Sequence, residues 1–191
     1  MQYLEQGELL KVLKLASKQS ARLHAMVLLA YRHGMRNSEV CGLRFDDIDQ
    51  KQWTVRIRRG KSSFTNVQAL STHPGQPLLD ERKVLKTWLT NRPVADRSSF
   101  VFTSQKGGKL DRSTFFRAFQ ALAQSAGLDK SKQHPHVLKH SLGSHLAQKN
   151  VNTSLIQQRL GHRSITSTAQ YIHLSDSQAS KVCDGVLADL Y

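Results

Sequence analysis

The sequence predicts a mainly α-helical fold with a small antiparallel β-sheet or hairpin. Apolar residues recur at helical spacing in most segments, whereas residues 53–58 (WTVRIR) alternate between apolar and basic side chains, as in a half-exposed strand. Gly and Pro residues separate the segments. A chain of 191 residues supports one sizeable core, so we expect a single domain over residues 1–191.

Two helices and a short third one are predicted first. Residues 4–19 carry leucines at helical spacing, and residues 21–33 form a largely buried second helix that ends at Gly34. Either Asn37 or Ser38 then caps a short helix.

A β-hairpin follows. Residues 53–58 form its first strand, Gly60 marks the turn, and residues 64–71 form one or two further short strands. Lys61 therefore lies at the mouth of the hairpin.

Helices return after the prolines that follow the hairpin. We expect a helix over residues 79–91, and another that begins at a cap formed by Asp111 or Ser113 and runs to Ala126. A short apolar piece, FVFT, lies between these two helices.

The C-terminal third is predicted to be helical throughout. Pro135 begins a helix, because proline suits the first helical position. Asn152 or Thr153 caps the next helix, which ends at Gly161. A short helix over residues 164–173 follows.

An amphipathic tail helix is predicted over residues 176–190. Its apolar positions suit two arrangements equally well. The helix either links neighbouring protomers or folds back on its own core.

The charge balance narrows the class of partner. The chain has 28 Lys and Arg residues against 14 Asp and Glu, a net charge of +14. Such a charge favours a polyanionic partner, and nucleic acid is the common one. We expect a cytoplasmic, nucleoid-associated protein, since no signal-peptide core or membrane-spanning apolar run is present. Cys41 and Cys183 lack metal-ligand spacing and are expected to be free thiols, although one long-range disulfide is the alternative.

Six residues have the chemistry needed to surround and cleave a phosphodiester. A tyrosine hydroxyl attacks phosphorus only with positive charge on the phosphoryl oxygens and a proton donor for the leaving oxygen. The candidates are Arg36, Lys61, His136, Lys139, His162 and Tyr171. Tyr171 is favoured over the other three tyrosines because His162 precedes it across a short turn.

Three basic residues fall on one helix face at positions i, i+3 and i+4: His136, Lys139 and His140. We interpret His140 as a residue that supports the catalytic side chains without contacting the phosphate itself. A surface capping cluster is the plain alternative. A metal site at His136 and His140 is a weaker one, because no acidic third ligand stands nearby. We therefore expect neither a metal nor another cofactor.

Arg36 can hold two phosphate oxygens with its planar fork. An ion pair with Glu39 is its alternative, and both roles are compatible if Glu39 orients the arginine. Lys61 is by default a solvated lysine. It becomes a proton donor to the leaving 5′ oxygen only if the hairpin leans over the scissile phosphate, and Arg58 and Arg59 compete with it for that role. Arg58, Arg59 and Arg163 are further expected DNA contacts.

These motifs together resemble the catalytic domain of the tyrosine recombinases, the phage integrase family. The resemblance runs from about Leu4 to the C-terminus and rests on GMRNSEVCGLRFDDID, the hairpin lysine, HPHVLKHSLGSHLA and LIQQRLGHRSITSTAQYIHL, in that order. In size the chain is similar to the fimbrial-switch invertases, which are little more than this domain. The N-terminal clamping domain of most members is expected to be absent, so the chain is either a minimal enzyme or a fragment.

The resemblance implies a role for each candidate. Arg36 is the first catalytic arginine, Lys61 the general acid, and Tyr171 the nucleophile that forms a 3′-phosphotyrosine and frees a 5′-hydroxyl. His136 assists proton transfer, and His162 hydrogen-bonds the phosphate. The implied partner is double-stranded DNA, held by a homotetramer on two sites with the help of DNA-bending accessory proteins.

One position departs from the family pattern. Lys139 stands where the family has its second arginine, which keeps the charge and loses the bidentate fork. The leading hypothesis is an active recombinase in which Lys139→Arg keeps or raises cleavage. The alternatives are a DNA-binding regulator that has reduced or lost catalysis, and a monomeric type IB topoisomerase.

Overall fold

A computed structural model describes residues 2–60, 63–93, 98–104 and 106–171, together with residues 184 and 188. It confirms the predicted fold class: α-helices dominate, and one small antiparallel sheet accompanies them. Lys61, Cys183 and nearly all of the predicted tail helix over residues 176–190 lie outside the described residues.

The described helices follow the predicted order. They are α1 (Gln6–Gln19), α2 (Ala21–Arg32), α3 (Asn37–Cys41), α4 (Glu81–Asn91), α5 (Arg112–Ser125), α6 (His136–Gln148), α7 (Thr153–Leu160) and α8 (Thr166–Ala169). Two 3-10 turns, η1 (Phe45–Asp47) and η2 (Lys130–Lys132), were not predicted.

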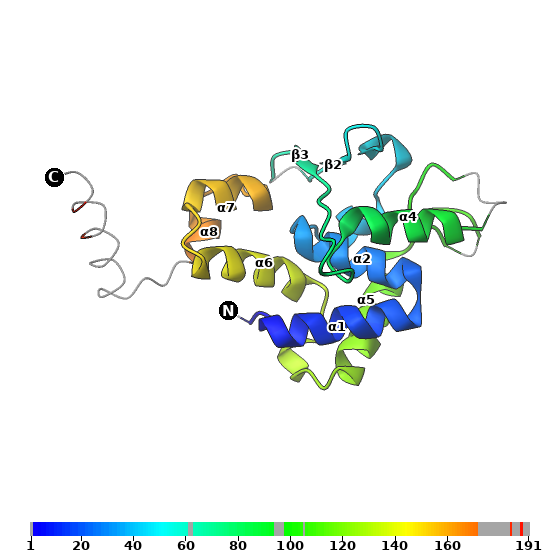
Figure 1. Cartoon of the computed structure of the whole chain (residues 1–191), viewed down its shortest axis with the longest axis horizontal. Helices are drawn as coiled ribbons and strands as arrows, with labels where there is room; N and C mark the ends of the chain where they lie inside the picture. Colours follow the sequence, from blue (N-terminus) through cyan, green and yellow to red (C-terminus); the bar gives the residue numbers. More distant parts are fainter. Residues whose placement is uncertain are drawn as a thin grey trace.

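Helix α2 is the centre of the fold. It packs against α1, α4 and α6, and all residues from Leu23 to Ala30 are buried. Figure 1 shows α1 and α5 on one side of α2, and α6 with α7 and α8 at the end of the molecule where the N-terminus also lies. Burial of α2 on several faces explains why its sequence is apolar almost all round.

The sheet has three strands in the order β1 (Ile48–Asp49), β2 (Thr54–Ile57) and β3 (Asn66–Ala69), each antiparallel to its neighbour. Val55 and Ile57 point into the core, and Arg56 points out, as the alternating sequence predicts. β1 was missed, because two residues are too short to show a period. Residues 64–71 contain one strand.

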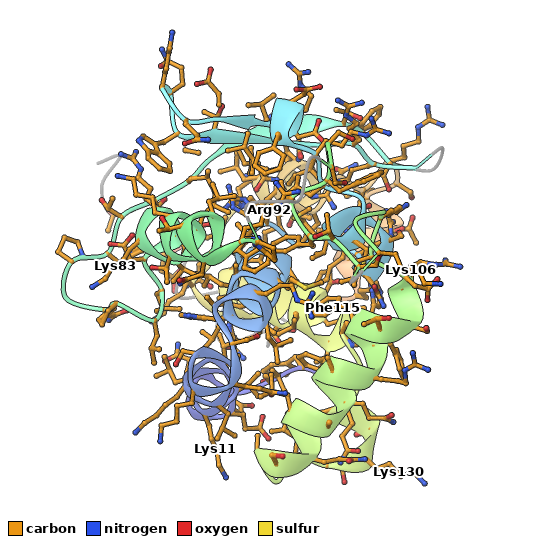
Figure 2. The ribbon with its side chains drawn as sticks, turned by 90° about the vertical axis from the view of Figure 1, so that its right-hand side faces the viewer. Lys11, Lys83, Arg92, Lys106, Phe115 and Lys130 are labelled. Atoms are coloured by element: carbon orange, nitrogen blue, oxygen red, sulfur yellow. The ribbon has the colours of Figure 1, made fainter. Side chains whose placement is uncertain are left out.

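The polar surface and the packed interior separate clearly in Figure 2. Lys11 and Lys130 project outward at the edge of the molecule opposite the sheet, while Phe115 points inward and is 1% exposed. A smaller second cluster is formed by Leu142, Ile156, Leu160 and Tyr171. No helix among the described residues is long and apolar enough to cross a membrane.

Helix ends were predicted with mixed success. Asp111 and Asn152 cap α5 and α7, and Gly161 ends α7 at a positive φ of 66°. The predicted Asn37 or Ser38 cap is wrong. Arg36 holds the cap position of α3 instead, because Glu39 reaches back to its backbone N–H.

Strand β3 fixes the end of α7. Gln68 donates from Nε2 to the Arg159 carbonyl at 2.9 Å, and Asn66 donates from Nδ2 to the Gln158 carbonyl at 2.7 Å. The Arg159 side chain in turn donates from Nη2 to the Arg32 carbonyl at 2.7 Å. These bonds engage carbonyls at the helix end and lock α7 to the sheet and to α2.

Candidate active site

Arg36 lies between α2 and α3 with one edge of its guanidinium anchored. Nη1 donates to Glu39 Oε1 at 2.9 Å and to Ser63 Oγ at 3.0 Å. Nε and Nη2 have no hydrogen-bond partner within the described ranges, and the side chain is 36% exposed. The anchored edge fixes the group, so the open edge is presented for an oxyanion. Sequence reasoning predicted Glu39 as the orienting group and missed Ser63.

Arg59 lies in the interior beside Glu39. Its guanidinium donates to Glu39 Oε2 at 3.1 Å and to the carbonyls of His33, Gly34 and Arg159 at 2.9 to 3.1 Å. The side chain is fully buried. A buried guanidinium cannot reach DNA. Arg59 was expected to contact DNA and to compete with Lys61 as proton donor, and neither expectation fits this placement. Arg59 holds together α2, α3 and the end of α7.

The other two expected DNA contacts are at the surface. Arg58 is more than half exposed and donates from Nε to Asp47 Oδ1 at 2.6 Å. Arg163 is exposed and stacks over the Phe64 ring at 5.6 Å from its centroid. Both side chains are placed where a bound polyanion can reach them.

The chain that follows Lys61 is paired with the segment that carries His162. Ser63 forms an antiparallel bridge with His162, and Phe64 N–H donates to the Gly161 carbonyl at 3.2 Å. Together with the Ser63 bond to Arg36, this pairing brings the end of the hairpin loop into the site.

Lys139 is buried on α6, at 2% exposure, and donates from Nζ to the Leu160 carbonyl at 2.7 Å. Burial, followed by the charges of Arg59 and Arg36, lowers the pKa of Lys139 to about 7. The ammonium thus supports the end of α7, and near neutral pH its charge depends on what binds nearby.

His162 follows Gly161 and is buried. Its Nδ1 lies 3.0 Å from Thr168 Oγ1, and its Nε2 has no hydrogen-bond partner among the described residues. Burial and then the charge of Lys139 lower the pKa of His162 to about 4. The neutral ring is held by Thr168 with one nitrogen left for a ligand. Thr168 was not predicted.

Gly161 has no room for a side chain, because an added Cβ would collide with the Arg59 side chain. With its positive φ of 66°, Gly161→Ala is expected to lower the free energy of unfolding by about 2 kcal/mol or more, as measured by urea denaturation. Gly75→Ala is the matched control, because nothing lies within 4 Å of its added Cβ. Equal stability of the two variants would contradict this reading of Gly161.

Tyr171 lies in a turn after α8, so the predicted helix over residues 164–173 is shorter than expected. Its ring stacks on His162 at 6.4 Å between centroids and lies against Gly143, where an added Cβ would come within 2.7 Å of it. The hydroxyl lies 3.0 Å from His140 Nδ1. Gly143 therefore leaves the space that the Tyr171 ring occupies.

Burial raises the pKa of Tyr171 to about 12. The sequence-based expectation was that neighbouring cations favour the ionised phenol. In the free protein burial dominates instead. Burial and the neighbouring His136 lower the pKa of His140 to about 4. The hydroxyl thus faces a neutral imidazole.

His136 and His140 stack edge to face at 4.4 Å between centroids. Desolvation, followed by the charge of Lys139, lowers the pKa of His136. His136 is exposed, whereas Lys139 is buried, so the two lie at different depths beside the same site. The described residues contain no group of three His, Cys, Asp or Glu side chains placed to hold a metal.

Comparisons with known proteins identify the family of this chain. Residues 2–178 match the model described as the phage integrase family. The type 1 fimbriae regulatory protein FimB of Escherichia coli strain K12 is 40% identical over 174 residues, which cover 88% of this chain and 82% of that protein. FimE of the same strain is 38% identical over 154 residues, which cover 79% of this chain and 74% of FimE.

Solved recombinase structures share the fold. The crystal structure of XerA recombinase superposes with a TM-score of 0.77 at 28% identity, covering 94% of this chain and 63% of XerA. XerH bound to its difH substrate in a pre-cleavage complex gives a TM-score of 0.78 at 25% identity, covering 96% of this chain and 54% of XerH. This chain therefore spans less than two thirds of either solved protein. With its family match over residues 2–178, the chain belongs to the phage integrase family of tyrosine-type site-specific recombinases.

Proposed function

We propose that Tyr171 attacks a DNA backbone phosphate, forms a 3′-phosphotyrosine link and frees a 5′-hydroxyl, and that the chain exchanges strands between two duplex sites in this way. The convergence of Arg36, Lys139, His162 and Tyr171 carries the proposal. These residues are far apart in sequence, and each is fixed by a contact within the site. A purely structural cluster has no need of an arginine edge and an imidazole nitrogen left open.

Phosphate binding falls to the groups with open donors. The open edge of Arg36 supplies two N–H donors, and His162 Nε2 supplies one in its protonated form. Lys139 contributes its positive charge from the interior side of the site, because its Nζ already donates a hydrogen bond to the Leu160 carbonyl. A bound phosphate favours the protonated forms of Lys139 and His162, and so restores the charge that burial removes.

The attack requires the phenolic proton to leave. The Tyr171 hydroxyl lies 3.0 Å from His140 Nδ1, and this nitrogen accepts the proton once the charge of the bound phosphate has raised the pKa of the ring above its value of about 4 in the free protein. The Oη–phosphorus bond forms while the bond from phosphorus to the 5′ oxygen breaks. The 5′ oxygen takes its proton from Lys61, the role that the family resemblance implies. The described Ser63, two residues further along, contacts Arg36 and supports this assignment.

Religation reverses these steps with the 5′-hydroxyl of another strand as the nucleophile. The phosphotyrosine link conserves the energy of the phosphodiester, so no cofactor is required. Two duplex sites must be held together for exchange, and we propose a homotetramer, assisted by accessory proteins that bend the DNA. A duplex partner is in keeping with the similar recombinase XerH, which was solved bound to its difH substrate.

A DNA-binding regulator without turnover is the second candidate. The observation in its favour is Lys139. It stands where the family pattern has its second arginine, and one of its N–H donors is already bound to the Leu160 carbonyl. Such a regulator keeps the open edge of Arg36 for binding and makes no use of the Tyr171 hydroxyl.

A nicked suicide substrate separates the two candidates. Duplex fragments from the DNA that flanks the gene are nicked at successive positions, incubated with the protein and resolved under denaturing conditions. We expect a protein–DNA adduct, with the DNA mapped to the peptide that contains Tyr171. Binding of the fragments without any adduct at Tyr171 would establish the regulator.

A further inference from the structure

A groove of about 630 Å³ opens beside the site, between α3 and the first turns of α5 and α6. Arg36 and His136 belong to its lining, so the groove is continuous with the candidate active site. Arg112, Phe116 and His134 also line the groove. The proposed chemistry uses none of these last three residues.

Three basic side chains of this groove, unlike that of Arg36, have no partner among the described residues. Arg112, His134 and His136 make no side-chain hydrogen bond or ion pair within the part of the chain that the structure describes, although His136 stacks on His140. Unpaired donors around one hollow favour an anion from outside.

One acidic residue also lines the groove. Asp111 is the cap of α5, and its Oδ1 accepts the Ser113 backbone N–H at 2.7 Å. Its carboxylate is thus already committed to the helix end, where the exposed N–H groups stabilise its charge. Beside this one carboxylate stand two guanidinium groups, those of Arg36 and Arg112.

Phe116 adds an apolar surface to the same wall. Its ring is 39% exposed, whereas the neighbouring Phe115 is buried in the core. An exposed aromatic ring beside unpaired cations suits a ligand that joins anionic groups to flat or apolar ones. A nucleotide chain has this composition, with phosphates next to sugars and bases.

We infer that this groove holds the nucleotide next to the scissile phosphate, with Arg112 and His134 binding its phosphate and Phe116 contacting its sugar or base. The inference rests on the proposed function, because Arg36 and His136 place the scissile phosphate at the end of the groove. It adds a second phosphate position to the site and assigns Arg112 and His134 as binding residues.

Salt-dependent binding of a fluorescent 40-base-pair duplex of mixed sequence tests the assignment. Arg112→Ala is expected to weaken binding about tenfold at low salt and to reduce the slope of log K against log salt by about 1, the change for one lost phosphate contact. His134→Ala is expected to weaken binding as well. Phe116→Ala weakens binding with the slope unchanged, because the lost contact carries no charge.

Lys11→Ala is the matched control. It removes the same charge from an exposed position on α1, and Figure 2 shows Lys11 projecting outward from the edge of the molecule opposite the sheet. For Lys11→Ala, the slope of log K against log salt should equal that of the unmodified protein. Equal slopes for Arg112→Ala and Lys11→Ala would overturn the inference. Adduct formation at Tyr171 would then still support the proposed function, whereas a chain that neither binds nor links to DNA contradicts both.

Discussion

Tyr171→Phe abolishes covalent attachment to DNA, with a loss on the order of 10⁴-fold or more, and leaves duplex affinity within about threefold. The phenyl ring keeps its stacking on His162 and its place against Gly143. Only the hydroxyl, and with it the bond to His140, is removed. Adduct formation on a nicked substrate measures the first effect, and a binding titration measures the second.

The chain offers a closely matched control in Tyr31. Its hydroxyl lies 2.9 Å from His145 Nδ1, so it forms a second, half-buried tyrosine–histidine pair. Tyr31→Phe should cost about 1 kcal/mol of stability and leave cleavage intact. A variant at Tyr171 that still forms adducts, or a variant at Tyr31 that loses them, would show that the nucleophile is misassigned.

Lys139→Met is expected to slow cleavage about 100-fold, the usual cost of removing one group that stabilises an oxyanion. Measured as kcat/KM, which reports the protein before DNA binds, cleavage by the unmodified protein should also fall relative to Lys139→Arg as the pH rises above about 7, because the free lysine then gives up its proton and arginine does not. The ratio of the two rates cancels any effect of pH on Tyr171 itself. A ratio that stays constant from about pH 6 to 9 would show that the charge of Lys139 is not used.

The same pKa has a consequence for folding. A lysine whose pKa is lowered in the folded state binds its proton more tightly when unfolded. Its burial therefore destabilises the fold fully below about pH 7, and this penalty disappears as the pH rises toward the ordinary lysine value of 10.5. Lys139→Met removes the dependence, so the free energies of unfolding of the two proteins should converge at alkaline pH.

Much of the backbone was predictable because glycine and proline limit it locally. Gly34 and Gly161 end their helices at positive φ, and Pro135 precedes α6. The depth of a charged side chain was harder to predict, since it depends on contacts across the fold. Arg59 was interpreted as a surface residue because it is charged. Its spacing from Val55 and Ile57 does carry the signal, for it continues the inward-facing alternation of β2.

The candidate site was predictable as a set of residue types and not as a set of contacts. Ser63 and Thr168 are common residues, and only the bridge between the hairpin loop and the His162 turn makes them partners of Arg36 and His162. Tyr171 was expected on a helix. Its actual position in a turn follows from the packing of its ring against α6, which no local pattern encodes.

Because the Tyr171 side chain meets His140 and His162 of its own chain, the proposed nucleophile and its proposed histidine partners lie within one copy. Consider a mixed assembly of two defective variants, one without the Tyr171 hydroxyl and the other without Arg36. Every subunit then lacks either the proposed nucleophile or a proposed phosphate-binding group. Such subunits cannot complement each other, so any division of labour within an assembly must concern timing rather than the supply of reactive groups.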